Sequence, residues 1–193
     1  MSPLDLSFHP VTAQRWDDFE TLFGPRGAVG GCWCMWFRLK RSEFEVQKGE
    51  GNKQAMRRII DSGEIPGLLA YHQEEPVGWC SVAPREDFPV LDRSRILKRV
   101  DDQPVWSVVC FFIARPYRHH GVSLQLLQAA LDYAQEHGAR IVEGYPVEPK
   151  KGSTPDVFAY TGLVSMFLQL GFVEAARRSE TRPLMRYYFG TPR

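Results

Sequence analysis

The sequence predicts an α/β fold with a mixed central sheet, and three features of its 193 residues support that prediction. Residues 105–113 form a nearly unbroken run of β-branched and aromatic side chains, which is typical of a strand covered on both faces. A glycine turn, an amphipathic helix and a second apolar run at 139–147 follow, which together indicate one βαβ unit with parallel strands. Strand-like runs at 67–82 and 172–189 add antiparallel strands on either side.

The bulk composition is that of one ordinary globular domain over residues 1–193, with 44% hydrophobic and 24% charged residues. The 24 Lys and Arg nearly balance the 23 Asp and Glu, which argues against a broad surface for nucleic acid or anionic membranes. No stretch approaches the roughly 20 apolar residues that span a bilayer, and residues 1–10 carry no signal-peptide pattern. We therefore expect a cytoplasmic protein whose four cysteines are reduced thiols.

The N-terminal third predicts one strand and two helices. Apolar positions alternate over residues 6–11, which favours a strand, and the helical pattern that follows ends at Gly24. Residues 27–38 combine glycines with a run of bulky side chains and match no standard element. Residues 43–52 are polar and predict a loop, whereas residues 53–61 place their apolar side chains on one side of a helix.

The βαβ unit forms the centre of the predicted sheet. Leu124, Leu127 and Leu131 recur at helical spacing between the two buried strands, so the connection is a helix with a right-handed crossover. Residues 83–102 form a long connection before the unit, and we expect a short helix within it. Residues 150–156 form a polar loop after it.

The outer elements complete the sheet. Residues 67–71 and 76–82 predict a hairpin joined by a tight polar turn. Residues 157–170 predict a helix, and residues 172–176 and 184–189 predict two further strands. The last strands leave an edge at which a second copy of the chain could pair, so a homodimer is one expected assembly.

The turn between the first buried strand and the central helix carries the chemistry. Backbone N–H groups at a helix N-terminus are unpaired and lie at the positive end of the helix dipole, so they bind phosphate. Gly121 lets the backbone approach phosphate oxygens, and Arg118 adds a charge-assisted donor. The G-x-x-x-x-G-K-[ST] pattern of P-loops and the G-x-G-x-x-G pattern of dinucleotide folds are both absent.

The pattern Arg118-x-x-Gly121-x-Ser123 resembles the R/Q-x-x-G-x-G/A motif of the GCN5-related N-acetyltransferase (GNAT) family. The later run from Phe167 to Gly171-Phe172 is similar to a second motif of that family, and the predicted element order agrees from residue 6 to residue 189. The segments 31–38 and 76–82 resemble those of a bacterial subgroup described only as acetyltransferases.

This resemblance implies a mostly antiparallel sheet whose two parallel strands splay apart, with acetyl-CoA bound as acyl donor in the gap. Backbone groups of the first central strand would pair with the pantetheine arm, amides of the turn would hold the pyrophosphate, and the last helix would flank the arm. The residues assigned to the cofactor in this way are Phe111, Phe112, Ile113, Arg118, His119, His120, Gly121, Val122, Ser123, Thr161 and Ser165.

Three side chains are candidates for proton transfer. Glu143 lies in the second buried strand, where a charged group needs a reason, and it is our first candidate for the base. The alternatives are that it faces solvent or pairs with an arginine. Tyr145 and Tyr160 are candidate acids, with packing as the alternative for each. Phe167 stands where the family often has a tyrosine that protonates the leaving thiolate, so that role is unfilled.

The predicted reaction is direct attack of a neutral primary amine on the thioester of acetyl-CoA in a ternary complex, with a small-molecule or protein amine as acceptor. A non-catalytic acyl-CoA sensor and a nucleotide-binding regulatory module are the alternatives. We expect no metal site, because the cysteines and histidines lack zinc-site spacing. For Cys110, a small buried hydrophobe is the default and a nucleophile the alternative.

Overall fold

The computed structural model describes residues 4–149 and 159–190, and their strands form one seven-stranded sheet. Its order is β1-β2-β3-β4-β5-β7-β6, and every neighbouring pair is antiparallel except β4 and β5. The predicted mixed, mostly antiparallel α/β fold is therefore confirmed. The strands are β1 (Ser7–Pro10), β2 (Gly67–His72), β3 (Glu75–Pro84), β4 (Trp106–Ile113), β5 (Ile141–Gly144), β6 (Val173–Arg177) and β7 (Pro183–Tyr188).

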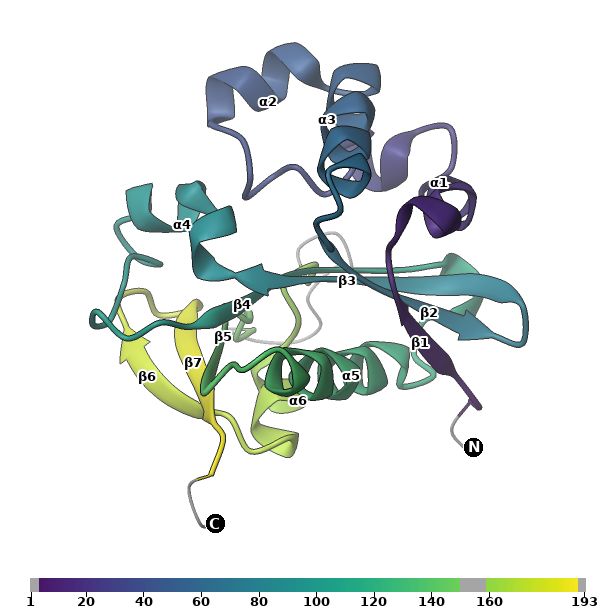
Figure 1. Cartoon of the computed structure of the whole chain (residues 1–193). Coiled ribbons are helices and arrows are strands. Elements are labelled where there is room, and N and C mark those ends of the chain that lie inside the picture. Colours follow the sequence, from purple (N-terminus) through teal and green to yellow (C-terminus); the bar gives the residue numbers. More distant parts are fainter. Residues whose placement is uncertain (1–3, 150–158, 191–193) are drawn as a thin grey trace.

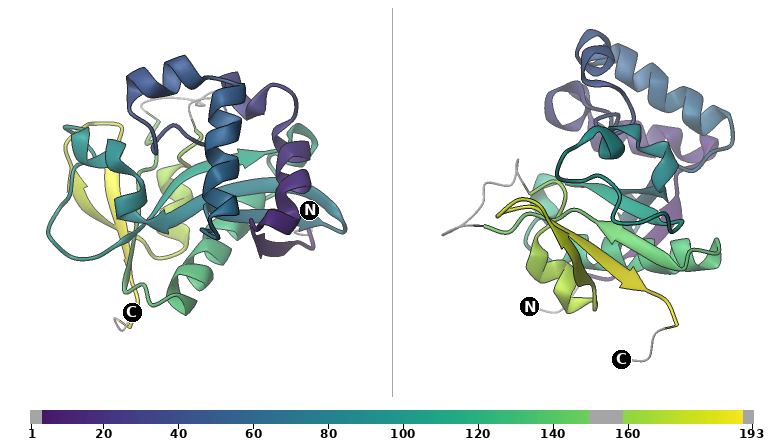
Figure 2. Two further views of the ribbon diagram at one scale, coloured as in Figure 1. Left: turned by 45° about the horizontal axis from the view of Figure 1, so that its top comes forward. Right: turned by 90° about the vertical axis from the view of Figure 1, so that its left-hand side faces the viewer.

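Helices cover both faces of the sheet (Figure 1), and a view along the sheet shows the resulting layers (Figure 2). The helices α1, α2 and α3 lie over one face, and α5 and α6 lie over the other. None of the helices in the described residues is long and apolar enough to cross a membrane. The helices are α1 (Trp16–Phe23), α2 (Arg41–Gln47), α3 (Glu50–Asp61), α4 (Pro89–Arg93), α5 (Val122–Glu136) and α6 (Val164–Gln169).

The helix α5 is the crossover of the predicted βαβ unit. It joins β4 to the parallel strand β5, and its apolar stripe packs against the sheet through side chains such as Leu126, Leu127 and Ala130, all fully buried. Burial of aliphatic side chains at helical spacing fixes which face of α5 turns inward. The N-terminus of α5 is thereby held at the C-terminal end of β4.

A bulge and an early end to pairing shape the middle of the sheet. Ser81 of β3 pairs with Cys110, and the next residue, Val82, pairs with Val108, so Val109 is an extra residue in β4. The strand β4 pairs with β5 only up to the pair Val108 and Gly144, and then runs on to Ile113. The two parallel strands thus separate at the bulge, as the predicted splay requires.

Two regions differ from the prediction. Residues 43–52 are not a loop but hold α2 and the start of α3, because Phe44 is a buried anchor that packs edge-on against Trp36 with ring centroids 5.0 Å apart. The predicted helix over 157–170 begins at Val164 in the described residues. The loop predicted over 150–156 lies outside the described residues.

Candidate active site

A cavity of about 840 Å³ opens where β4 leaves β5. Its walls come from residues 28–37, the helix α2, the C-terminal half of β4, the turn into α5, and residues 159–169. Three stretches that are distant in sequence, residues 28–48, 110–124 and 159–169, therefore line one largely apolar space. Such a cavity is the usual form of a cofactor or substrate site.

The turn from β4 into α5 presents backbone donors to this cavity. Gly121 has a left-handed backbone with φ of 77°, and α5 begins at the next residue without a side-chain N-cap. Gly121, Val122 and Ser123 all line the cavity, so the uncapped amides of the first turn lie at its wall. Arg118 also lines it, and its Nε donates to the carbonyl oxygen of Ile113 at 3.1 Å. This is the arrangement that binds phosphate at a helix N-terminus.

Most of the residues predicted to hold the cofactor are brought together here. Two are placed elsewhere: His120 bonds through Nδ1 with the carbonyl oxygen of Arg118 at 2.7 Å, and Thr161 is fully buried and accepts from Arg182 at 3.2 Å. Neither side chain is part of the cavity wall. The predicted cofactor residues that line the cavity are Phe111, Phe112, Ile113, Arg118, His119, Gly121, Val122, Ser123 and Ser165.

The three predicted proton-transfer residues are divided between two places. Tyr160 lines the cavity, and the Arg182 guanidinium lies 5.8 Å from its ring centroid. Glu143 and Tyr145 are fully buried and are not among the residues of the cavity wall. The alternative in which Glu143 pairs with an arginine is the geometry observed, because Arg85 Nη1 donates to its Oε2 at 2.7 Å.

Glu143 belongs to a buried network of charged groups. Arg186 Nε donates to Glu143 Oε1 at 2.8 Å, and the Tyr145 hydroxyl donates to Oε2 at 2.9 Å. Burial raises the pKa of Tyr145 well above its ordinary value, and the Glu143 charge adds to that effect. Asp101 holds the pKa of Arg186 above its ordinary value through a hydrogen bond. Each charge in the network thus has a partner of opposite sign, which offsets the cost of its burial.

Three cysteines line the same cavity, and sequence reasoning did not bring them together. Cys34 Sγ donates to Cys110 Sγ at 3.2 Å, and a hydrogen bond with Cys34 lowers the pKa of Cys32 to about 6. Burial raises the pKa of Cys34 well above its usual value. The Cys-x-Cys spacing at 32–34 is the signal available in the sequence, but nothing in the sequence joins it to Cys110, 76 residues beyond Cys34.

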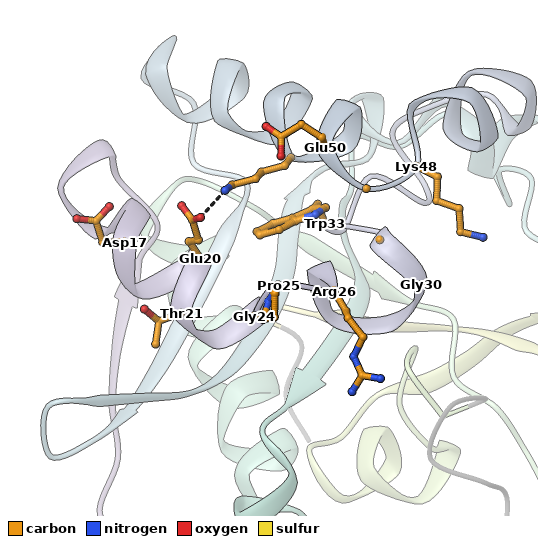
Figure 3. Close-up of a pocket in the computed structure, with 13 residues that line it drawn as sticks. Asp17, Glu20, Thr21, Gly24, Pro25, Arg26, Gly30, Trp33, Lys48 and Glu50 are labelled. Atoms are coloured by element: carbon orange, nitrogen blue, oxygen red, sulfur yellow. Dashed lines mark hydrogen bonds and ion pairs between the residues drawn. The ribbon is translucent and has the colours of Figure 1, made fainter.

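A second cavity of about 980 Å³ adjoins the first, since Gly30 and Lys48 line both (Figure 3). The Trp33 ring forms part of its wall, and the Lys53 ammonium lies 5.3 Å from that ring centroid. Lys53 also pairs with Glu20, and this hydrogen bond lowers the pKa of the carboxyl group. Three carboxylates line this second cavity, namely Asp17, Glu20 and Glu50.

Comparison with known proteins relates this chain to acetyltransferases. A model described as the acetyltransferase (GNAT) family matches residues 33–150. The fold is similar to PaiA N-acetyltransferase from Thermoplasma acidophilum in complex with coenzyme A, with a TM-score of 0.55 and 13% identity, covering 96% of this chain and 100% of that one. A mosquito arylalkylamine N-acetyltransferase like 5b is similar with a TM-score of 0.59 and 11% identity, covering 96% and 100% of the two chains. Aminoglycoside N-acetyltransferase AAC(6')-Iy in complex with CoA is similar with a TM-score of 0.53 and 14% identity, covering 92% of this chain and 94% of that one. Among curated proteins, none matches.

Proposed function

Because the chain belongs to the acetyltransferase (GNAT) family, as the motif at residues 118–123 predicted, we propose that it transfers the acetyl group of acetyl-CoA to a primary amine. The observation that carries this proposal is the uncapped N-terminus of α5, which opens into the cavity formed where β4 leaves β5. One site thereby offers a phosphate-binding turn and a strand edge that no other strand in the described residues pairs with, where an extended arm can bind. A CoA thioester combines both of these requirements in one molecule.

The pyrophosphate is assigned to the amides that follow Gly121, and the pantetheine arm to the edge of β4 at Phe111 and Ile113. The Phe111 N–H donates at 2.6 Å to the carbonyl oxygen of Tyr160. A backbone donor that already holds a carbonyl oxygen at this distance suits the thioester oxygen, which becomes an oxyanion when the amine attacks. We therefore assign Phe111 N–H to the oxyanion, with the Tyr160 carbonyl displaced when acetyl-CoA binds.

Direct attack of the neutral amine forms a tetrahedral intermediate, and its collapse breaks the C–S bond and releases CoA thiolate, while the amine nitrogen loses one proton to solvent. We assign the protonation of this thiolate to the Tyr160 hydroxyl, because Tyr160 is the member of the predicted trio that lines the cavity. Phe167, which stands at the position where the resemblance implies a tyrosine, is fully buried and carries no hydroxyl group. Glu143 and Tyr145 are assigned to the support of β5 through their buried network rather than to proton transfer.

The acceptor is assigned to the second cavity, which adjoins the first at Gly30 and Lys48. Its wall holds three carboxylates and three cationic side chains, so charge alone does not select the acceptor: Asp17, Glu20, Glu50, Arg26, Lys48 and Lys53 (Figure 3). Two cavities in contact allow the thioester and the amine to be bound at the same time, as a ternary complex requires. The acceptor is a primary amine, on a small molecule or on a protein.

Calorimetry with acetyl-CoA, CoA and ATP tests the cofactor, and release of free thiol with a panel of amines tests the reaction. We expect binding of both CoA species and thiol release with at least one primary amine of the panel. Binding of ATP without binding of either CoA species would overturn the proposal. Binding of acetyl-CoA without turnover on any amine would favour a non-catalytic acyl-CoA sensor, the alternative that the missing hydroxyl at Phe167 supports.

A further inference from the structure

Three thiols from two distant segments meet in the wall of the main cavity. Cys34 Sγ donates to Cys110 Sγ at 3.2 Å, Cys34 also interacts with the Cys32 sulfur, and the Cys32 thiol donates to the Gly27 carbonyl oxygen at 3.6 Å. Cys34 is buried, whereas Cys32 and Cys110 are half-buried and line the open cavity. A small reactant that enters the cavity can therefore reach Cys32, and Cys34 lines the same cavity.

The backbone around Cys32 is strained. Non-glycine residues rarely adopt positive φ, yet Ala28, Trp33 and Cys34 have φ of 61°, 43° and 52°. Backbone hydrogen bonds at Val29 and Cys34 contribute to the lowered pKa of Cys32, whose thiol donates to the Gly27 carbonyl oxygen at 3.6 Å when it is protonated. The segment 27–38, whose sequence matches no standard element, thus has a physical role.

A buried positive charge stands beside this cluster. The Arg38 side chain is 5% exposed, and its Nε and Nη2 find no hydrogen-bond partner among the described residues. Its nearest carboxylate oxygen, on Asp87, is 3.7 Å away, and its guanidinium also interacts electrostatically with Cys34. An underpaired buried cation stabilises negative charge on the adjacent sulfurs.

We propose that Cys32, Cys34 and Cys110 form a peroxide-sensitive thiol relay whose stable product is a disulfide between Cys34 and Cys110. In the first step, the Cys32 thiolate attacks one oxygen of hydrogen peroxide and the O–O bond breaks. Cys32 is oxidised to a sulfenic acid, and the peroxide is reduced to hydroxide. The Cys34 thiol then attacks the sulfenic sulfur, its proton leaves with the hydroxyl group as water, and a Cys32–Cys34 disulfide forms.

The disulfide then moves to Cys110. Two cysteines separated by one residue close a small strained ring, and Cys110 Sγ lies 3.2 Å from Cys34 Sγ. Attack of Cys110 on the Cys34 sulfur expels Cys32 as a thiolate, the best leaving group of the three because its thiolate is the most stabilised. The proton of Cys110 neutralises the hydroxide of the first step. One peroxide thus oxidises two thiols and yields two waters, and the bond ties the segment 27–38 to β4.

The test is peroxide treatment of the folded full-length chain, quenching with iodoacetamide, and peptide mapping by mass spectrometry without reduction. The wild-type protein should yield a Cys34–Cys110 cross-link, with Cys32 alkylated and Cys80 recovered as a thiol. Cys80 is fully buried on β3, in the core on the α5 side, so Cys80→Ser is the matched control and should oxidise at the wild-type rate. The cross-link should also raise the melting temperature, because it closes a long loop.

Variants identify the order of the steps. Cys32→Ser should form the cross-link at least about tenfold more slowly, since the stabilised thiolate is missing. Cys34→Ser should accumulate a sulfenic acid at Cys32 that dimedone labels, and Cys110→Ser should stop at the Cys32–Cys34 disulfide. A wild-type protein that keeps all of its thiols, or forms a cross-link through Cys80, overturns the proposal without any variant. Dimedone labelling of Cys110 in place of Cys32 in Cys34→Ser overturns the order.

Discussion

The backbone N–H of Phe111 donates to the carbonyl oxygen of Tyr160 at 2.6 Å, across the gap that opens where β4 leaves β5. The contact joins the free edge of the bulged strand to the segment that precedes α6. In the proposed complex, the pantetheine arm lies along this edge and the thioester oxygen accepts from the Phe111 N–H. The Tyr160 side chain lines the cavity at the same point, so main chain and side chain of this residue are assigned different roles.

Tyr160→Phe tests the role of the hydroxyl group alone, because the backbone contact with Phe111 is kept. We expect kcat to fall by about 100- to 10,000-fold, the usual contribution of a positioned acid, with an unchanged Kd for acetyl-CoA. Steady-state thiol release and calorimetry measure the two quantities. Tyr187→Phe on β7, outside the cavity wall, is the control and should leave both unchanged. An unaltered kcat in Tyr160→Phe would remove Tyr160 as the acid.

Gly121→Val should abolish cofactor binding. Gly121 has φ of 77°, which valine adopts only at a cost of roughly 1–2 kcal/mol, and its new side chain would stand where the phosphate approaches the amides of α5. Gly138→Val is the matched control, because Gly138 has φ of 84° at the other end of α5 and is equally open. Both variants should lose similar stability in thermal melts, and Gly121→Val alone should bind acetyl-CoA at least about tenfold more weakly. Equal affinities in the two variants would contradict the placement of the pyrophosphate.

Glu143→Gln separates a structural role from a catalytic one. The substitution leaves Arg85 and Arg186 buried with a missing counter-charge, so we expect the free energy of unfolding to fall by about 3 kcal/mol. Glu174→Gln, which breaks an exposed pair with Arg177, should cost less than about 1 kcal/mol. Urea denaturation measures both. If Glu143→Gln is as stable as wild type but loses turnover at constant affinity, Glu143 is the base after all.

The βαβ centre and the hairpins could be predicted because local pattern decides them. A fully apolar run such as 105–113 has one stable place in a sheet, and the turn at Gly121 follows it directly. The helix α2 was missed because one buried side chain, Phe44, anchors an otherwise polar segment. Side-chain partners at long range had no such local signal. Neither the pairing of Glu143 with Arg85, 58 residues away, nor the approach of Cys34 to Cys110 follows from spacing.

Alkylation of Cys32 by iodoacetamide should depend on pH with a midpoint of about 6, because the thiolate is the reactive form and hydrogen bonds with Cys34 and backbone amides lower the pKa of Cys32. The rate should rise through this midpoint and level off above it. Cys34→Ser should move the midpoint upward, since it removes the thiol that makes the largest contribution. Other titratable or charged groups that line the cavity are Arg41, Glu45, Lys48, Cys110, Tyr117, Arg118, His119 and Tyr160.

Cys32→Ser is the control for the other titratable groups of the cavity. Alkylation that remains in this variant comes from residues other than Cys32 and is subtracted from the wild-type profile. A midpoint near the usual thiol value in the wild-type protein would contradict a stabilised thiolate at Cys32. It would leave the cofactor assignment untouched, because the turn at Gly121 belongs to a different segment of the chain.

Phe167→Tyr tests whether a hydroxyl group at residue 167, which the family resemblance implies, would protonate the leaving thiolate and raise kcat. The Phe167 ring is fully buried, packs on Phe172 with centroids 4.8 Å apart, and occupies the space that any side chain at Gly144 would need. It is not part of the cavity wall, so a new hydroxyl would be buried without a designed partner at a cost of about 1–3 kcal/mol. We expect a lower melting temperature and no gain in kcat. A rise in kcat would place the acid at residue 167, overturn the assignment to Tyr160, and show that the wild-type chain carries out its transfer without a side-chain acid.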